Sequence, residues 1–198
     1  MNKVIRNYHG HLSGVYCMKI HEGLSVLISG GRDSTARVWD VRVRKQVHAL
    51  VGHSHTVGSI ITQECEPHVI TGSYDSFIKL WDIGSGRCIN TLTNHKKSVR
   101  AIVEHPSEYT FASAASDNIK VWRCPNGSFL RNISGHRSII DAMAVFLRLC
   151  RSIKTTFWLV EEMKELSNSG TGNPAITSRR FYVNLNQDQL LPRMAYFH

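Results

Sequence analysis

Short runs of apolar and β-branched residues follow one another along the first 145 residues, separated by turn residues such as Gly, Asp and Ser. The first three runs are VYCMKIH (15–21), VLISGG (26–31) and TARVWDV (35–41). Short runs that alternate or are fully apolar, and are rich in Val, Ile and Thr, favour strands over helices. The pattern therefore predicts an all-β fold for this part of the chain.

These runs recur with a fixed period. A histidine, preceded by glycine in all units but one, opens each unit: His11, His53, His95 and His136. A tryptophan lies near the end of the third run in three units: Trp39, Trp81 and Trp122. The histidines are spaced by 42, 42 and 41 residues and the tryptophans by 42 and 41. A fourth run, such as QVHALVGH in the first unit, leads to the next histidine, so each unit predicts four strands.

Four strands per unit of about forty residues, with Gly-His and Trp-Asp signatures, resemble the WD40 repeat, which forms one blade of a β-propeller. The resemblance extends from about residue 4 to residue 145. It implies WD40 blades with these boundaries: the end of a preceding blade at 1–11, whole repeats at 12–53, 54–95 and 96–136, the start of a fourth at 137–145 and a divergent tail at 146–198.

Three whole repeats and part of a fourth form an incomplete ring. A propeller removes its exposed strand edges by closing the ring. We therefore expect the chain by itself to be prone to aggregation or to need partners.

The resemblance also implies a hydrogen-bonded group of four side chains in each blade. It joins the Gly-His histidine, a Ser or Thr ending the second strand, an Asp of the next turn and the tryptophan. The matching residues are His11, Ser29, Asp33 and Trp39; His53, Thr71, Asp75 and Trp81; and His95, Ser113, Asp117 and Trp122. Buried indole and imidazole groups need such partners, so we expect these groups to be structural.

A His, a Ser and an Asp together also have the composition of a hydrolase triad. A triad occurs once per active site, whereas this set occurs three times. The histidines recur once per blade and so lie too far apart to share a metal ion. The five cysteines include no CxxC pair, so disulfides and zinc are not expected. The sequence predicts no enzyme, no catalytic or metal site and no cofactor.

Composition limits the partners without identifying them. The chain has 24 Lys and Arg against 15 Asp and Glu, a net charge of +9 at pH 7, but the basic residues are scattered. This balance suits an acidic protein or a nucleic acid. The start of the chain lacks the apolar core of a signal peptide, and the apolar run 142–147 is too short to span a bilayer. We expect an intracellular protein with no membrane partner and no small-molecule substrate.

Longer segments are more particular than the generic repeat. TNHKKSVRA (93–101) and SFLRNISGH (128–136) closely resemble a family of nuclear, seven-bladed WD40 proteins of the spliceosomal Prp19-associated complex. The resemblance implies a non-catalytic scaffold in pre-mRNA splicing that is located in the nucleus. Its implied partners are spliceosomal proteins, with RNA in the vicinity.

A second class of function stays open. Some WD40 proteins are substrate receptors of cullin-4 ubiquitin ligases and carry a Trp-Asp-x-Arg sequence. Residues 39–42 of this chain fit that sequence. The alternative is therefore a ubiquitin-ligase receptor or another signalling scaffold, although Arg42 is also consistent with a solvated strand end.

Loop positions on one face of the blades are the candidate contacts for a partner. These positions are Tyr16, Arg32, Thr56, Tyr74, Lys96, Lys97, Ser98, Arg100 and Ser116. Tyr and Arg are enriched in binding hot spots. Lys96, Lys97 and Arg100 form a small basic group that could meet phosphate or an acidic partner. Each position is equally consistent with an ordinary solvated loop.

After Val145 the pattern of strands and turns is lost. Taken as it stands, the segment 156–166 predicts a short helix and the rest a polar tail. If the DNA encoding 156–178 is read two nucleotides further on, permitted codons give a strand with an Asp turn and a Trp-Asp pair, as in a WD40 blade. We therefore hypothesise that the reading frame shifts after Val145 and that 146–198 is not an evolved domain.

Overall fold

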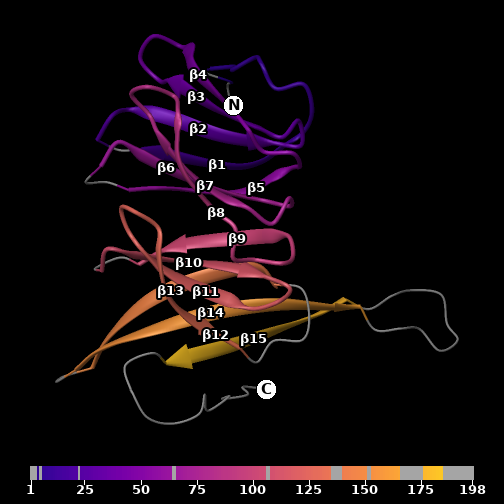
Figure 1. The fold of residues 1–198 in the computed structure, drawn as a ribbon, viewed down its shortest axis with the longest axis vertical. Helices are drawn as coiled ribbons and strands as arrows, with labels where there is room; N and C mark the ends of the chain where they lie inside the picture. The colour runs from indigo at the N-terminus through magenta and orange to yellow at the C-terminus, as the bar shows by residue number, and fades with distance from the viewer. Residues whose placement is uncertain are drawn as a thin grey trace, which may run out of the picture. The chain divides into compact units, whose positions relative to one another are not determined.

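The computed structural model describes residues 4, 6–21, 23–63, 66–105, 108–134, 140–150, 153–165 and 176–184. All regular elements among these residues are antiparallel strands, grouped in four sheets (Figure 1). The chain divides into two compact units, Met1–Val99 and Arg100–His198. The described residues contain no helix that is long and apolar enough to cross a membrane.

The first unit contains two four-stranded sheets, each formed by strands consecutive in the chain. The first sheet consists of β1 (Val15–His21), β2 (Val26–Gly31), β3 (Thr35–Asp40) and β4 (Lys45–Val51). The second consists of β5 (Val57–Thr62), β6 (His68–Ser73), β7 (Ile78–Asp82) and β8 (Cys88–Leu92). The all-β WD40 architecture expected from the sequence is thus present.

A third four-stranded sheet begins at Val99 and otherwise lies in the second unit. Its strands are β9 (Val99–Glu104), β10 (Thr110–Ala115), β11 (Ile119–Arg123) and β12 (Ser128–Ile133). In all three sheets the pairing register between the third and fourth strands shifts just before a tryptophan, at Trp39, Trp81 and Trp122. The three sheets are therefore structural repeats that share even the position of this β-bulge.

The core of the first unit lies between its two sheets. Its buried residues are Val26, Ile28, Ala36, Val38 and Leu50 on the first sheet and Val57, Ile60, Val69, Trp81 and Ile83 on or beside the second. Gly30 lies against the second sheet, because an added Cβ would be 2.7 Å from Val57 Cγ1, and that Cβ would also be 2.8 Å from Cys17 Sγ of β1 in its own sheet. The backbone can come this close because the glycine has no side chain.

Hydrogen bonds also join the two sheets. His21 and Glu66 meet through Nε2 and the backbone oxygen at 3.2 Å, as do His48 and Gly84. The thiol of Cys17 donates to the backbone oxygen of Val57 at 3.5 Å. Burial raises the pKa of the Cys17 thiol to about 12, so the group is protonated at neutral pH.

The two faces of the first sheet differ in exposure. Met18 of β1 lies 42 residues before Ile60 of β5, so the two residues occupy the same position in successive repeats. Ile60 is 7% exposed because it packs in the core between the sheets, whereas Met18 is 68% exposed. Ile20 and its counterpart Thr62 show the same contrast. The contact that β5 makes with the first sheet thus has no counterpart at β1 among the described residues.

In the second unit, β13 (Ile140–Cys150) packs on the third sheet. Ile140 is buried in a cluster with Ala101, Ala112, Ala114, Ile119 and Val121, and Met143 packs against that cluster. β13 also forms a three-stranded sheet, in the order β13-β14-β15, with β14 (Ile153–Glu165) and β15 (Ile176–Asn184).

The prediction of a helix at 156–166 is wrong, because residues up to Glu165 belong to β14. Glu161, Glu162, Met163 and Lys164 are all residues with good intrinsic helix propensity. β14 instead pairs with β13 on one side and with β15 on the other. This pairing satisfies backbone groups on both edges, and the β-rich run IKTTFWLV favours it.

The contrast between Met18 and Ile60 gives a matched test of the core. We expect Ile60→Asp to lower the free energy of unfolding by about 3 kcal/mol or more, because it buries an unpaired carboxylate. Met18→Asp places the same group in solvent and should stay within about 0.5 kcal/mol of the parent chain. Urea unfolding of the three proteins at one concentration would measure both values, and equal losses would contradict the packing described.

Candidate functional site

A chain of hydrogen bonds runs through the first sheet. The indole N–H of Trp39 donates to Ser29 Oγ at 2.8 Å, and the same oxygen lies 2.8 Å from His11 Nε2. His11 Nδ1 lies 3.0 Å from Asp33 Oδ2. An ionised carboxylate can only accept, so Nδ1 donates its proton to Asp33; in the neutral imidazole Nε2 then accepts from the Ser29 hydroxyl, which itself accepts from the indole N–H. The structure thus brings together all four predicted residues of this repeat.

The second sheet repeats this arrangement with threonine in place of serine. Trp81 Nε1 donates to Thr71 Oγ1 at 2.8 Å, and Thr71 Oγ1 lies 2.8 Å from His53 Nε2. His53 Nδ1 lies 2.8 Å from Asp75 Oδ2. Thr71 is fully buried, and His53 and Trp81 are buried with it. The hydroxyl between them is therefore sealed from solvent.

The third repeat is divided between the two units. Trp122 Nε1 donates to Ser113 Oγ at 2.8 Å, and both residues are buried. Asp117 lies half-buried in the turn before β11. His95 is buried and belongs to the first unit.

The two aspartates of the first unit fasten loops together. Asp33 accepts from the backbone N–H of Leu12 at 3.0 Å and from the hydroxyl of Thr35 at 2.9 Å. Asp75 accepts from the backbone N–H groups of Ser54 at 3.0 Å and Phe77 at 2.9 Å. Each carboxylate therefore ties the loop before the first strand of its sheet to the turn between the second and third strands.

The pKa of these carboxyls reflects the same contacts. Burial raises the pKa of Asp75, but hydrogen bonds from His53, Phe77 and Ser54 outweigh burial and lower it to about 2. Burial also raises the pKa of Asp33, but hydrogen bonds from Leu12, His11 and Thr35 outweigh burial and lower it to about 2. Both carboxyls are ionised at neutral pH.

The glycine before the histidine has a steric purpose. A Cβ added at Gly10 would lie 2.8 Å from Trp39 Cη2 and 2.9 Å from Arg37 Nη1. At Gly52 it would lie 3.3 Å from Trp81 Cη2. The Gly-His pair therefore lets the backbone pass directly over the edge of the indole.

One repeated feature was not expected from the sequence: a basic residue lies two positions before each tryptophan. These residues each donate to a polar side chain on the fourth strand of their sheet: Arg37 to Gln46 at 2.6 Å, Lys79 to Thr91 at 3.1 Å and Lys120 to Asn132 at 2.9 Å. Lys120 is buried and lies 5.6 Å from the centre of the Phe129 ring. The signal in the sequence was a basic residue at the same place in every repeat.

The networks offer no accessible nucleophile. In the first two sheets the hydroxyl that a hydrolase would use is buried and is already engaged by the indole and the imidazole. Across the described residues, no group of three or more His, Cys, Asp or Glu side chains is placed to hold a metal ion. In the first two sheets, the network instead holds the loops against the interior of the sheet.

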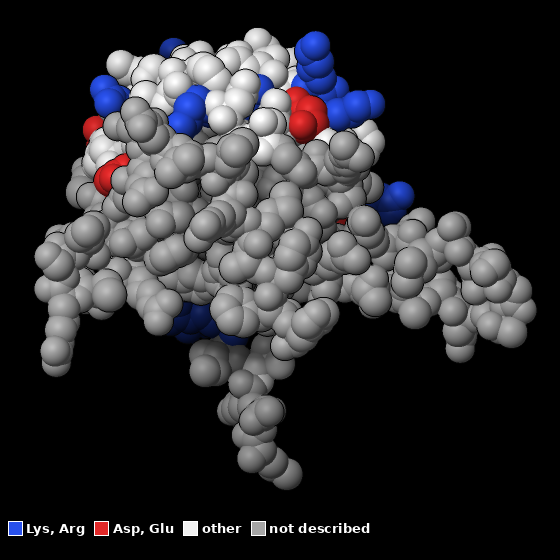
Figure 2. Space-filling view, turned by 90° about the horizontal axis from the view of Figure 1, so that it is seen from below, with Lys and Arg blue, Asp and Glu red and all other residues white. Residues whose placement is uncertain are grey.

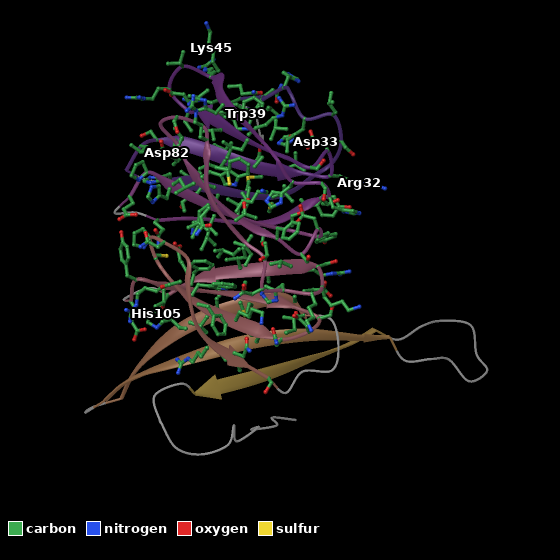
Figure 3. The ribbon with its side chains drawn as sticks, in the orientation of Figure 1. Arg32, Asp33, Trp39, Lys45, Asp82 and His105 are labelled. Atoms are coloured by element: carbon green, nitrogen blue, oxygen red, sulfur yellow. The ribbon has the colours of Figure 1, made fainter. Side chains whose placement is uncertain are left out.

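Those loops form one end of the first unit. Arg32 donates its backbone N–H to Gly14 at 2.8 Å, and Tyr74 does the same to Thr56 at 3.0 Å. The close contact of Gly30 with Val57 joins the two pairs of loops. We call the surface made of residues 12–16, 32–34, 54–58, 74–76 and 93–98 the Arg32 end. Figure 3 shows Arg32 and Asp33 at this end, Asp82 at the opposite end and Trp39 between them.

The candidate contact residues are not equally available. In the first unit, Tyr16, Arg32, Lys96 and Lys97 are exposed, whereas Tyr74 and Ser98 are half-buried. Thr56 is only 5% exposed, so its side chain has little surface for a partner. In the second unit, Ser116 is half-buried, and Arg100 Nη1 lies 2.6 Å from Asp141 Oδ1. Asp141 therefore already balances the charge of Arg100. Of the basic group expected from the sequence, only the two lysines remain.

Comparison with known proteins identifies the class. The family described as WD domain, G-beta repeat, matches residues 2–40, 44–82 and 86–123, which is more than half of the chain. The chain belongs to this WD40 repeat family. The crystal structure of RRP9 WD40 repeats is similar in fold, with a TM-score of 0.69 over 80% of this chain and 48% of that one, at 20% sequence identity.

Individual relatives match shorter stretches. Pleiotropic regulator 1 of Homo sapiens and that of Bos taurus are each 56% identical over 43 residues, which is 22% of this chain and 8% of the relative. Pre-mRNA-splicing factor prp5 of Schizosaccharomyces pombe is 61% identical over 28 residues, 14% of this chain and 6% of the relative. The matched stretch is thus less than a tenth of the length of each of these relatives.

The shared hydroxyl can be tested by substitution. Thr71→Val keeps the shape of the side chain but leaves Trp81 Nε1–H and His53 Nε2 without their partner, so we expect a loss of about 2–4 kcal/mol in the free energy of unfolding. Thr71→Ser keeps the hydroxyl and should lose only about 1 kcal/mol for the missing methyl group. Denaturant unfolding measures both; if the serine variant lost as much as the valine variant, the network would not be the cause.

The lowered carboxyl pKa values imply acid sensitivity. Asp33 and Asp75 titrate near pH 2 in the folded chain, below the ordinary value of 3.8, so the unfolded chain binds more protons as the pH falls. Their contribution to stability is full above about pH 4 and is lost between about pH 4 and pH 2. Unfolding free energies across this range should fall less steeply in Asp75→Asn than in the parent chain. An identical slope in the two proteins would refute the assignment.

Proposed function

We propose that this chain is a non-catalytic scaffold of nuclear pre-mRNA splicing. It acts through protein contacts as a component of the spliceosome and its Prp19-associated complex. The observation that carries the proposal is the 61% identity with a Pre-mRNA-splicing factor, together with the 56% identity with Pleiotropic regulator 1. The segments TNHKKSVRA and SFLRNISGH support the same assignment by their resemblance to spliceosomal WD40 proteins.

The structure suits a scaffold. In the first two sheets, Asp33 and Asp75 join the loops by hydrogen bonds to His11 and His53, whose side chains are 7% and 1% exposed. Surfaces on a rigid frame lose little conformational entropy when they bind, and their loop residues can vary without harm to the core. The Arg32 end therefore supplies a surface for partners that is already ordered.

Affinity purification of the tagged chain from nuclear extract tests the proposal. We expect proteins of the Prp19-associated complex to co-purify and to remain bound after RNase treatment, because the contacts are between proteins. Recovery of none of these proteins, or loss of all of them with RNase, would overturn the proposal.

The alternative of a cullin-4 substrate receptor depends on Arg42. Its side chain is 75% exposed at the end opposite Arg32, with Nη2 3.5 Å from Asp40 Oδ2. The group is thus available to an adaptor protein. Co-purification of a cullin adaptor that is lost in Arg42→Ala, without splicing proteins, would favour this alternative.

A further inference from the structure

Positively charged side chains reach solvent at the Arg32 end of the first unit. Arg32 is exposed in the turn between β2 and β3. Lys96 and Lys97 are exposed in the segment that follows β8, and the pairing of Leu92 with Ile78 starts that segment at the same end of the sheet. Figure 2 shows Lys and Arg side chains at several separate places on the surface.

The acidic side chains described at this end are almost fully buried and present little charge to a binding protein. Asp33 and Asp75 have side chains only 6% and 4% exposed, and each carboxylate is bound to a histidine, His11 or His53. The opposite end has more exposed cations, Arg42, Arg44, Lys45 and Arg87, but half-buried Asp40 and Asp82 lie beside them. The exposed charge described at the Arg32 end is therefore positive alone, whereas the opposite end presents both signs.

Apolar and aromatic groups lie among these cations. Leu12 is 88% exposed and Tyr16 is 55% exposed. The ring of Tyr74 stacks on that of His55, with 6.1 Å between centroids and 27° between planes. Gly58 makes room for this pair, since a Cβ there would lie 2.6 Å from Tyr74 Cε1. A partner would thus meet flat aromatic surface beside positive charge, a combination typical of binding hot spots.

We propose that the Arg32 end binds an extended acidic segment of a partner protein. Carboxylates of the segment pair with Arg32 and with Lys96 and Lys97, and an apolar side chain between them packs on Tyr16 or on the Tyr74–His55 pair. Complementary charge selects and orients such a partner. The inference rests on the proposed scaffold function and specifies the chemistry of one of its contacts.

The same features favour a protein segment over RNA. Nucleic-acid binding gains its affinity by neutralising many phosphates, on the order of 6–10 contacts in well-studied cases. The exposed cations named at this end are Arg32, Lys96 and Lys97, and exposed Leu12 offers nothing to a phosphate backbone. An acidic peptide needs fewer charge pairs and makes use of the apolar surface.

Fluorescence anisotropy with a labelled synthetic peptide of alternating Glu and Leu tests the inference on the full chain. The control peptide has Gln in place of every Glu. We expect the acidic peptide to bind about tenfold more tightly than the control, and its binding to weaken as salt rises through the range in which surface charges are screened. No binding, or equal binding of the two peptides, would overturn the inference.

Arg32→Glu and Arg42→Glu form a matched pair. Both replace an exposed arginine of the first sheet, but at opposite ends, so neither should alter the thermal unfolding curve. Arg32→Glu should weaken the acidic peptide by about tenfold and Arg42→Glu by less than about twofold. Equal effects would place the binding elsewhere. A single-stranded RNA that bound more tightly than the peptide, and depended on Arg32, would make this end an RNA surface instead.

The purification experiment separates this inference from the proposed function. If the parent chain recovers splicing proteins and Arg32→Glu recovers all of them equally well, the scaffold function stands and the acidic contact at Arg32 is wrong. If the parent chain recovers none of them but binds the acidic peptide through Arg32, the surface is correctly assigned and the splicing function is wrong.

Discussion

In each of the first two sheets, one buried hydroxyl is hydrogen-bonded to both the indole of a tryptophan and the imidazole of a histidine. Ser29 or Thr71 accepts a hydrogen bond from an indole N–H and donates one to an imidazole nitrogen. A buried polar group without a partner costs about 1–3 kcal/mol, so the hydroxyl allows a large aromatic side chain and a histidine to share the interior. The position of the histidine then determines where its aspartate lies, and the aspartate determines the course of two loops. The arrangement of the Arg32 end follows from this interior bond.

The repeat made the strands predictable from the sequence, and the resemblance to WD40 blades implied the hydrogen-bonded networks. A single Trp39 or Ser29 means little, but the same residue types at a spacing of 42 can be assigned jointly to one position in a blade. Arg37, Lys79 and Lys120 were missed for a different reason, although they recur just as regularly. A basic residue in a strand is expected to face solvent, whereas these side chains lie across the sheet and donate to the fourth strand.

Exposure could not be derived from the repeat, because it depends on neighbours. Met18 and Ile60 hold the same repeat position and differ from exposed to buried. Thr56 was expected at the surface from its place in a loop, yet it is buried. The segment β14 shows the same limit for secondary structure, since pairing with β13 and β15 overrides the helix formers Glu161 to Lys164. Local pattern identifies an element well where the repeat supports it and poorly where only propensity remains.

The thiol wedged between the first two sheets has a chemical consequence. Cys17 is protonated at neutral pH because its pKa is raised to about 12, and a thiol reacts with alkylating reagents only as the thiolate. Cys88, by contrast, is exposed on β8. Brief alkylation of the folded chain should therefore modify Cys88 and spare Cys17. Modification of Cys17 then reports separation of the two sheets, so the chain carries its own reporter of how often they come apart.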